Sequence, residues 1–249
     1  MDNIAIKLQK ITKKYVIHHE KPTLIEKIVK QRNESFFALK NICFEIRFGE
    51  RVGIIGANGS GKTTILKIIS CITSPTSGIV TTKGKIVSLI DLEAGFHPDL
   101  TGEQNVFLNG MLLGMNKEEI VRELKHIIKF ANIGRFIDIP LFTYSQGMKL
   151  RLGFSIAIHA KPDILILDEN MSIGDRKFKK TTYDKIQETI SKNKTIIIAS
   201  HDLKFIGENC DRVIWLEKGK IIADGQANKV IAKYINAYNS RSFKNGDNL

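Results

Sequence analysis

A glycine-rich stretch at residues 56–63 is the feature that most restricts how this chain can fold. It reads Gly-Ala-Asn-Gly-Ser-Gly-Lys-Thr, which matches the Gly-x-x-x-x-Gly-Lys-Ser/Thr pattern of phosphate-binding loops. An apolar run at residues 52–55 precedes it, and the helical spacing of Ile65, Leu66 and Ile69 follows it. Because such a loop needs a strand before it and a helix after it, the stretch predicts an α/β fold with a phosphate site at the loop.

The residue types in this stretch suit the phosphates of ATP. Glycine lets backbone N–H groups turn inward around a phosphate, and the N-terminus of the following helix adds partial positive charge. Lys62 is expected to reach the β- and γ-phosphates, and the Thr63 hydroxyl is expected to hold Mg²⁺. The residues expected to bind ATP here are Gly56, Asn58, Gly59, Ser60, Gly61, Lys62, Thr63 and Thr64.

Two carboxylates end a second apolar run. Residues 164–167 read Ile-Leu-Ile-Leu, and Asp168 and Glu169 follow them. Ligands of α/β proteins bind at the carboxyl ends of the strands, so both side chains are expected near the phosphates. Asp168 would hold Mg²⁺, partly through water, and Glu169 would orient or deprotonate the water that attacks the γ-phosphate. Without the glycine-rich loop, the same pair would only cap a strand.

His201 follows a third apolar run, at residues 195–199. A single histidine at a strand end is more often structural than functional. Its place at the same edge of the sheet favours a contact with the γ-phosphate.

Apolar runs alternate with helical patterns along the chain, as expected for an α/β protein. The runs at residues 164–167 and 195–199 are continuously apolar, which is typical of strands covered on both faces of a parallel sheet. Strands are expected at residues 5–8, 38–46, 51–55, 85–90, 164–167 and 195–199. Helices are expected at residues 62–69, 117–129, 146–159 and 230–238, the second of them led by an Asn116-x-x-Glu119 cap.

Three further segments stand apart from this core. Residues from about 96 to 160 are mainly helical and are expected to form a separate lobe. An insertion at about residues 18–36 contains a Thr23-x-x-Glu26 capping box and an apolar face. That helix could pack on its own core or dock on a partner, and the sequence leaves both possibilities open. Residues 240–249 are polar, and a frayed tail is expected there.

Composition narrows the chemistry. The three cysteines lie far apart without Cys-x-x-Cys spacing, so neither a disulfide framework nor a zinc site is indicated. No apolar run approaches the roughly 20 residues that span a bilayer, and no secretory signal is evident, so a cytosolic protein is expected. The formal charge of +12 suits nucleic acid, an anionic membrane or simply a lysine-rich surface, and it does not decide the partner.

The ordered motifs resemble those of the nucleotide-binding subunits of ABC transporters over nearly the whole chain. They are the loop at residues 56–63, Tyr-Ser-Gln-Gly-Met at 144–148, Asp168 with Glu169, Ser-Ile-Gly-Asp at 172–175, and His201. The resemblance implies a P-loop NTPase fold at residues 1–239, with a mainly parallel sheet core, an antiparallel β portion and a helical lobe. It also implies ATP hydrolysis with Mg²⁺.

By this resemblance, residues 144–148 are a variant of the family's signature, which is usually Leu-Ser-Gly-Gly-Gln. Ser145, Gln146 and Gly147 would complete the ATP site of the opposite subunit at a helix N-terminus. A homodimer that holds two ATP molecules head to tail is therefore implied.

Of the family's other functional positions, three have counterparts in this chain and one does not. His201 would clamp the γ-phosphate, Asp175 would lie in the loop that connects the two sites, and Tyr15 would stack on adenine. The family's magnesium-sensing glutamine has no counterpart, and only Asp91 or Glu93 is available to replace it.

Three departures resemble one subfamily, the ATPase subunits that export O-antigen, capsule or teichoic-acid polysaccharides. They are the insertion, the Tyr-Ser-x-Gly-Met signature, and Ala-Gly-Phe-His-Pro-Asp-Leu-Thr-Gly at residues 94–102 ahead of Asn105. Partners implied are permease subunits on a separate chain and a lipid-linked polysaccharide as substrate, at the cytoplasmic face of a bacterial inner membrane. No C-terminal carbohydrate-binding domain is expected.

Alternatives from other classes remain. An importer or drug-exporter ATPase shares the catalytic residues but not the insertion. An ABC ATPase acting on nucleic acid or ribosomes normally has tandem cassettes or long coiled coils, which this sequence lacks, so no nucleic-acid partner is expected. A non-transport assembly factor is a third possibility.

Overall fold

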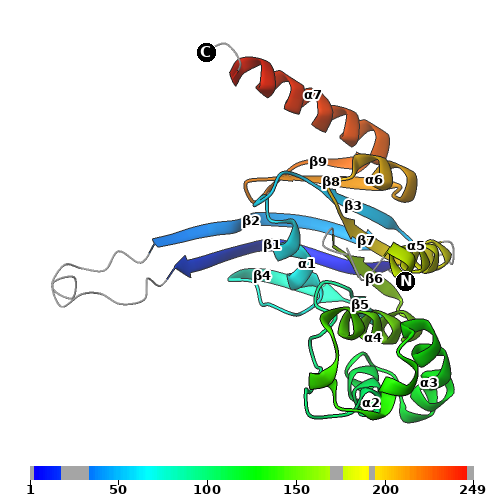
Figure 1. Cartoon of the computed structure of the whole chain (residues 1–249). Coiled ribbons are helices and arrows are strands. Elements are labelled where there is room, and N and C mark those ends of the chain that lie inside the picture. Colours follow the sequence, from blue (N-terminus) through cyan, green and yellow to red (C-terminus); the bar gives the residue numbers. More distant parts are fainter. Residues whose placement is uncertain (1–2, 18–33, 169–175, 191–193, 246–249) are drawn as a thin grey trace, which may run out of the picture.

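Two sheets and seven α-helices make up the part of the chain that the computed structural model describes, residues 3–17, 34–168, 176–190 and 194–245 (Figure 1). The strands are β1 (Ile4–Ile17), β2 (Glu34–Arg47), β3 (Arg51–Ile55), β4 (Ser77–Thr82), β5 (Ile86–Ser88), β6 (Ile164–Leu167), β7 (Thr195–Ala199), β8 (Arg212–Glu217) and β9 (Lys220–Gln226). The helices are α1 (Lys62–Ile69), α2 (Gly102–Leu112), α3 (Lys117–Ala131), α4 (Gln146–His159), α5 (Arg176–Ile190), α6 (Leu203–Asn209) and α7 (Ala227–Asn245), with 3-10 turns η1 (Gly134–Asp138) and η2 (Leu141–Thr143).

The larger sheet has the order β5-β6-β7-β3-β8-β9. All neighbours run parallel except β8 and β9, which pair antiparallel. Side chains alternate across its buried strands: Ile164 and Ile166 of β6 join one core, and Leu165 and Leu167 join the other. Both faces of the strand are therefore covered, as its continuous apolar sequence predicted. The expected α/β class is confirmed.

The smaller sheet, β2-β1-β4, is antiparallel, and its buried face packs with α1 on one face of the larger sheet. Strands β1 and β2 extend well beyond the segments expected from the sequence, and residues 34–36 of the expected insertion belong to β2. Tyr15 pairs with Phe36, and Ile17 with Glu34, so the pairing continues to the ends of both strands. The rest of the insertion, with its expected helix, lies outside the described residues.

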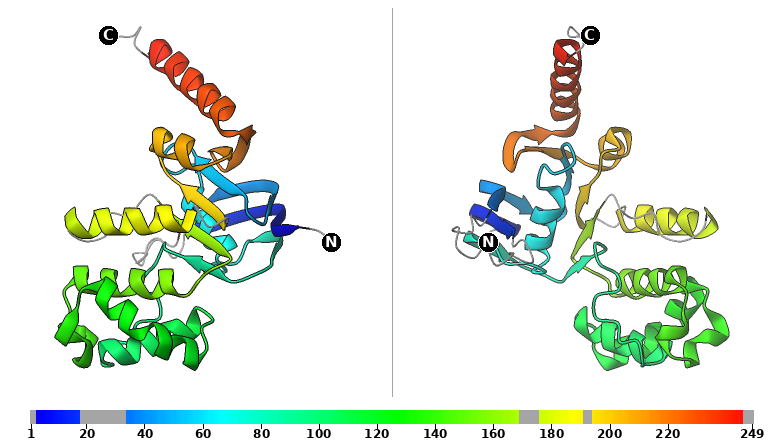
Figure 2. Two further views of the ribbon diagram at one scale, coloured as in Figure 1. Left: turned by 90° about the vertical axis from the view of Figure 1, so that its right-hand side faces the viewer. Right: turned by 60° about the vertical axis from the view of Figure 1, so that its left-hand side comes forward.

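Helices α2, α3 and α4 group with η1 and η2 on the far side of the molecule from α7 (Figures 1 and 2). The expected capping box of α3 is confirmed, because the Asn116 side chain accepts from Glu119 N at 2.8 Å and the Glu119 carboxylate accepts from Asn116 N at 2.9 Å. Both bonds satisfy donors that the helix itself leaves open.

Helix α7 is longer than expected at both ends and includes residues 240–245 of the expected tail. The helix is anchored at its start, where Val230 is buried and Tyr234 packs edge-on against Trp215 with ring centroids 5.3 Å apart. Within the described ranges, no helix combines the length and the apolar character needed to cross a membrane.

Candidate functional site

The glycine-rich loop joins β3 to α1 in a shape that only glycine permits at two points. Gly56 has φ 151° and Gly61 has φ 108°, both in the region that other residues rarely adopt. A Cβ at Gly56 would collide with the Leu216 carbonyl, and one at Gly61 would lie 2.7 Å from the Ala38 carbonyl oxygen. At Gly59 a Cβ would have no atom within 4 Å, so the loop faces open space there. A phosphate can approach that backbone closely.

The turn between β8 and β9 also contacts the loop and stabilises it. Gly219 N donates to the Ser60 carbonyl at 3.0 Å, and Lys40 N donates to the Gly219 carbonyl at 2.8 Å. A Cβ at Gly219 would lie 2.6 Å from the Ala38 carbonyl oxygen. The turn thus connects β2 to the loop through backbone atoms, a contact between distant segments that sequence reasoning missed.

Three expected phosphate and magnesium residues meet at the start of α1. Lys62 is buried, and its Nζ donates to the carbonyls of Gly56 at 2.9 Å and Ala57 at 3.4 Å. The Thr63 hydroxyl donates to Asp168 Oδ2 at 3.2 Å. Hydroxyl and carboxylate oxygens are the ligands that Mg²⁺ prefers, so this pair fits the expected metal. Half-buried Thr64 follows on the same helix.

His201 lies beside the loop, although it is far from it in sequence. It lies two residues after the end of β7, and with Gly56, Ala57 and Asn58 it lines a cleft of about 560 Å³. The next residue, Asp202, caps α6 by accepting from Phe205 N at 3.0 Å. The expected neighbourhood of His201 and the loop is therefore present, and its contact with the γ-phosphate stays a prediction.

The expected signature residues lie at the N-terminus of α4. Ser145 caps this helix and accepts from Met148 N at 3.3 Å. Ser145 and Gln146 are exposed, and a Cβ at Gly147 would have no atom within 4 Å. The helix end is open to solvent and offers N–H groups to an external anion.

Tyr144 replaces the leucine usual at the start of the signature, and the fold explains the change. Its ring is buried, and its hydroxyl donates to the Phe136 carbonyl. Burial raises the pKa of Tyr144 to about 12. A Cβ on Gly102, the first residue of α2, would collide with the Tyr144 hydroxyl. The larger side chain at 144 and the missing one at 102 thus fit each other.

Residues 91–93, where the family's magnesium-sensing glutamine is expected, contact the signature and helix α4. Gln146 Nε2 donates to Glu93 Oε1, and a Cβ at Gly153 of α4 would collide with the Leu92 carbonyl. The structure therefore places Glu93 against the signature. Asp91 is exposed in the same loop. Whether either residue replaces the glutamine stays a prediction.

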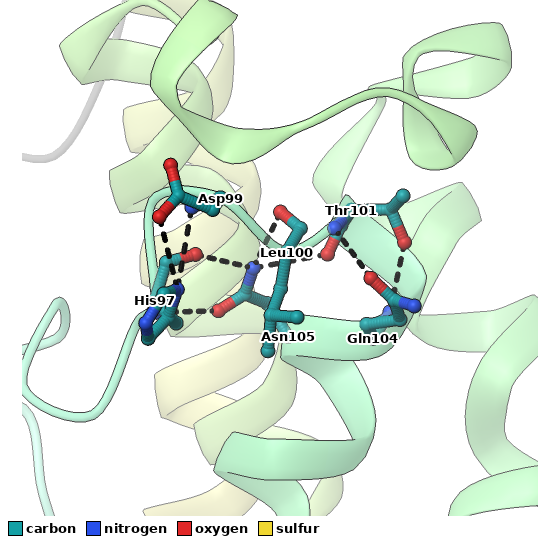
Figure 3. Close-up of polar contacts among 6 residues, drawn as sticks. All are labelled: His97, Asp99, Leu100, Thr101, Gln104 and Asn105. Atoms are coloured by element: carbon teal, nitrogen blue, oxygen red, sulfur yellow. Dashed lines mark hydrogen bonds and ion pairs between the residues drawn. The ribbon is translucent and has the colours of Figure 1, made fainter.

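The turn that follows this loop is organised by one buried side chain (Figure 3). Asn105 Nδ2 donates to the carbonyls of His97, Leu100 and Thr101 at 3.0, 3.0 and 2.9 Å, and its Oδ1 accepts from His97 N at 2.8 Å. Thr101 and Gln104 close a capping box at the start of α2. The 94–102 pattern noted in the sequence is therefore the turn that sets the entry of α2.

Tyr15 lies on β1, stacked on Phe36 of β2 with ring centroids 5.5 Å apart. Lys13 Nζ lies 5.1 Å from the Tyr15 ring and donates to the Ser74 carbonyl at 2.7 Å. Phe36 lies two residues before Ala38, which contacts the phosphate loop. Stacking of adenine on Tyr15 stays a prediction. Glu169 and Asp175 lie outside the described residues.

Comparison with known proteins decides the family. A family model described as ABC transporter matches residues 39–172, more than half of the chain. The chain belongs to the ABC transporter family. Members of this family carry ATP-hydrolysing cassettes, and the matched range includes the phosphate loop, Thr63 and Asp168.

Curated relatives of this ABC cassette carry export names. An O-antigen export system ATP-binding protein, RfbB of Klebsiella pneumoniae, is 37% identical over 238 residues, which cover 92% of this chain and 97% of the relative. The teichoic acids export ATP-binding protein TagH of Bacillus cereus is 38% identical over 247 residues, covering 97% of this chain and 45% of the relative. The chain therefore spans nearly all of one relative and about half of the other.

Solved ABC cassettes share the fold. A dimeric post-hydrolysis structure of the cassette MJ0796 with ADP and Pi has a TM-score of 0.68 and 25% identity, covering 89% of this chain and 98% of that one. The ATP-binding subunit of an ABC transporter aligns with a TM-score of 0.71 at 20% identity, over 92% and 93% of the two chains. The latter supports the fold alone.

Proposed function

We propose that this chain is the ATP-hydrolysing subunit of an ABC transporter that exports a lipid-linked polysaccharide. The observation that carries the ATPase part is the Thr63–Asp168 pair beside the open loop at Gly59. The export part rests on relatives named for O-antigen and teichoic-acid export.

Hydrolysis would use the loop, Lys62, Thr63, Asp168 and His201 together with Glu169. Backbone N–H groups of the loop and Lys62 would hold the phosphates, once Lys62 exchanges its carbonyl partners for phosphate oxygens. Thr63 and Asp168 would hold Mg²⁺, which would supply positive charge to the phosphates. Glu169 would accept a proton from water as its oxygen attacks the γ-phosphorus, while the bond to the ADP oxygen breaks. His201 would stabilise the γ-phosphate.

Two copies would close on two ATP molecules. The N-terminus of α4 supports this, because Ser145 is exposed and a Cβ at Gly147 would meet no atom within 4 Å, so a second copy can reach this helix end. Tyr15 would stack on adenine, and Asp175 would connect the sites. Relatives of the fold have been solved as dimers.

The membrane partner would be a permease on a separate chain, at the cytoplasmic face of a bacterial inner membrane. Exposed Met111, Leu112 and Phe142 on the helical lobe support a docking surface there. Leu112 borders Gly95, and the same loop reaches the signature through Glu93 and Gln146. Permease movement would thus be passed to the signature through this loop.

The decisive test of the ATPase is Glu169→Gln. We expect this variant to bind ATP normally, to lose at least about 100-fold in turnover, as general-base removal does, and to retain unhydrolysed ATP. Glu118→Gln, an exposed carboxylate on α3, is the matched control and should turn over like the parent. Unchanged turnover in Glu169→Gln would remove Glu169 from the mechanism. Lys62→Ala should weaken ATP binding itself.

The transported polymer is tested in the cell. Deletion of the gene should remove one surface polymer, and Lys62→Ala should not restore it. Loss of a glycerol- or ribitol-phosphate polymer would assign teichoic-acid export. Loss of an O-antigen or capsule glycan would assign export of that glycan. A deletion strain with all surface glycans intact would contradict polysaccharide export and favour another ABC transporter.

A further inference from the structure

Helix α7 has an apolar face. The rest of the protein covers the start of this face, and the face continues beyond the covered part. Val230 is buried and Tyr234 half-buried at the covered end. At the next positions of the same helical spacing, Ile235 is 41% exposed and Tyr238 is 63% exposed. In all views α7 projects away from the sheets toward its C-terminal end (Figures 1 and 2). Its exposed apolar side chains therefore lie on a projecting arm.

This exposed end shares a cleft with the phosphate loop. Tyr234, Ile235, Tyr238 and Asn239 form one wall, and residues 56–58 with His201 form the other. The cleft beside the phosphate loop and His201 is thus continuous with the apolar face of α7.

We infer that Ile235 and Tyr238 contact a second copy of this chain when ATP is bound, so that α7 is part of the ATP-dependent dimer interface. The inference rests on the proposed ATP dimer and adds to it an element outside the family motifs. In a head-to-tail dimer the opposite subunit covers the loop and His201, so side chains on the facing wall of the same cleft come within its reach. Tyrosine and aliphatic side chains at such a site are typical of interface cores.

The arrangement favours a second copy over the permease. The exposed apolar side chains proposed for permease docking lie on the helical lobe, and the lobe and α7 occupy opposite ends of the molecule (Figures 1 and 2). Only the α7 surface shares its cleft with the phosphate loop and His201 among the described clefts. A partner that closes on ATP bound at the loop would come close to that cleft.

The test compares ATP-driven dimerisation in a Glu169→Gln background. We expect Ile235→Ala with Tyr238→Ala to raise the dimer dissociation constant at least about tenfold in sedimentation velocity, as loss of buried interface side chains does. The matched control is Ile222→Ala with Ile79→Ala, whose side chains are 41% and 63% exposed on β9 and β4. Monomer affinity for a fluorescent ATP analogue should be the same in all three proteins.

A second measurement detects burial without relying on energetics. In a Cys43→Ser, Cys71→Ser background, which removes the two exposed thiols, Tyr238→Cys should react with maleimide more slowly once ATP is added to the Glu169→Gln protein. Ile79→Cys should react at the same rate with and without ATP.

The outcomes separate the two proposals. If the parent dimerises with ATP but the α7 variant dimerises equally well and Tyr238→Cys is not protected, the α7 inference is wrong and the ATP dimer stands. If the parent stays monomeric with ATP, the proposed dimer is wrong, and the role of α7 with it.

Discussion

Tyr144 shows how one residue can depart from a family pattern without loss of the structure around it. Its hydroxyl reaches the Phe136 carbonyl only because Gly102 has no side chain. Leucine at position 144 would leave that space empty and the carbonyl without this donor. The two positions are therefore expected to respond to substitution as a pair.

Gly102→Ala tests this pairing. The added methyl would collide with the Tyr144 hydroxyl, so we expect a loss of about 1–3 kcal/mol in the free energy of unfolding, the usual cost of overpacking. Tyr144→Phe alone should cost about 0.5–1.5 kcal/mol through the lost hydrogen bond. In the double variant the clash is removed, so denaturant unfolding should show a combined loss smaller than the sum. Strict additivity would contradict the pairing.

At the scale of elements, α3, α4 and α5 meet around an aromatic cluster that includes a histidine. The rings of Phe130, Phe154 and Phe178 contact one another, and His159 packs edge-on against Phe130 at 5.9 Å. His159 Nδ1 donates to the Ser155 carbonyl at 2.7 Å. Burial lowers the pKa of His159, because the charged ring is poorly solvated there.

Protonation of His159 should therefore weaken the packing of these helices. Since the pKa is lower in the folded state, the unfolded chain binds the proton more tightly, and stability should fall as pH drops through about 6.5, the ordinary value for histidine. Glu123, whose charge raises this pKa, opposes the effect, while Lys185 and His126 add to it. Denaturant unfolding at pH 7.5 and 5.5 should show a smaller pH-dependent loss in His159→Gln. His97→Gln, an exposed histidine outside this cluster, is the control, and an equal reduction there would contradict the assignment.

Elements were predictable from the sequence where a local pattern was sufficient. The continuously apolar β6 and β7, the helix after the phosphate loop and the Asn116 cap of α3 were all found. Strands β4, β8 and β9 were missed. In β4 and β9 exposed residues break the apolar run, whereas the short buried run of β8 was overlooked; α5 was missed because its sequence is mostly polar. Contacts such as Glu93 with Gln146 depend on the tertiary fold and leave no local signal.

For the molecule as a whole, ligand binding and stability are linked through the site. ATP with Mg²⁺ should stabilise the folded chain by about 2.7 kcal/mol at 100 times its dissociation constant. In Thr63→Val the hydroxyl near Asp168 is lost, so the additional stabilisation by Mg²⁺ should largely disappear, while ATP alone should act as before. Thermal unfolding with ATP, with and without Mg²⁺, measures this, and Thr81→Val on exposed β4 is the control. A full magnesium effect in Thr63→Val would exclude this hydroxyl as a ligand.

The backbone contacts of Gly219 with Ala38, Lys40 and Ser60 have a consequence for how such cassettes can be altered. These contacts hold residues 38–40 of β2 near the phosphate loop. Along β2, residues 38–40 lie on the loop side of the strand ends at Ile17 and Glu34. Because these contacts use main-chain atoms, they do not depend on neighbouring side chains. Changes in the sequence that joins Ile17 to Glu34 are therefore expected to leave the backbone of the ATP-binding loop in place.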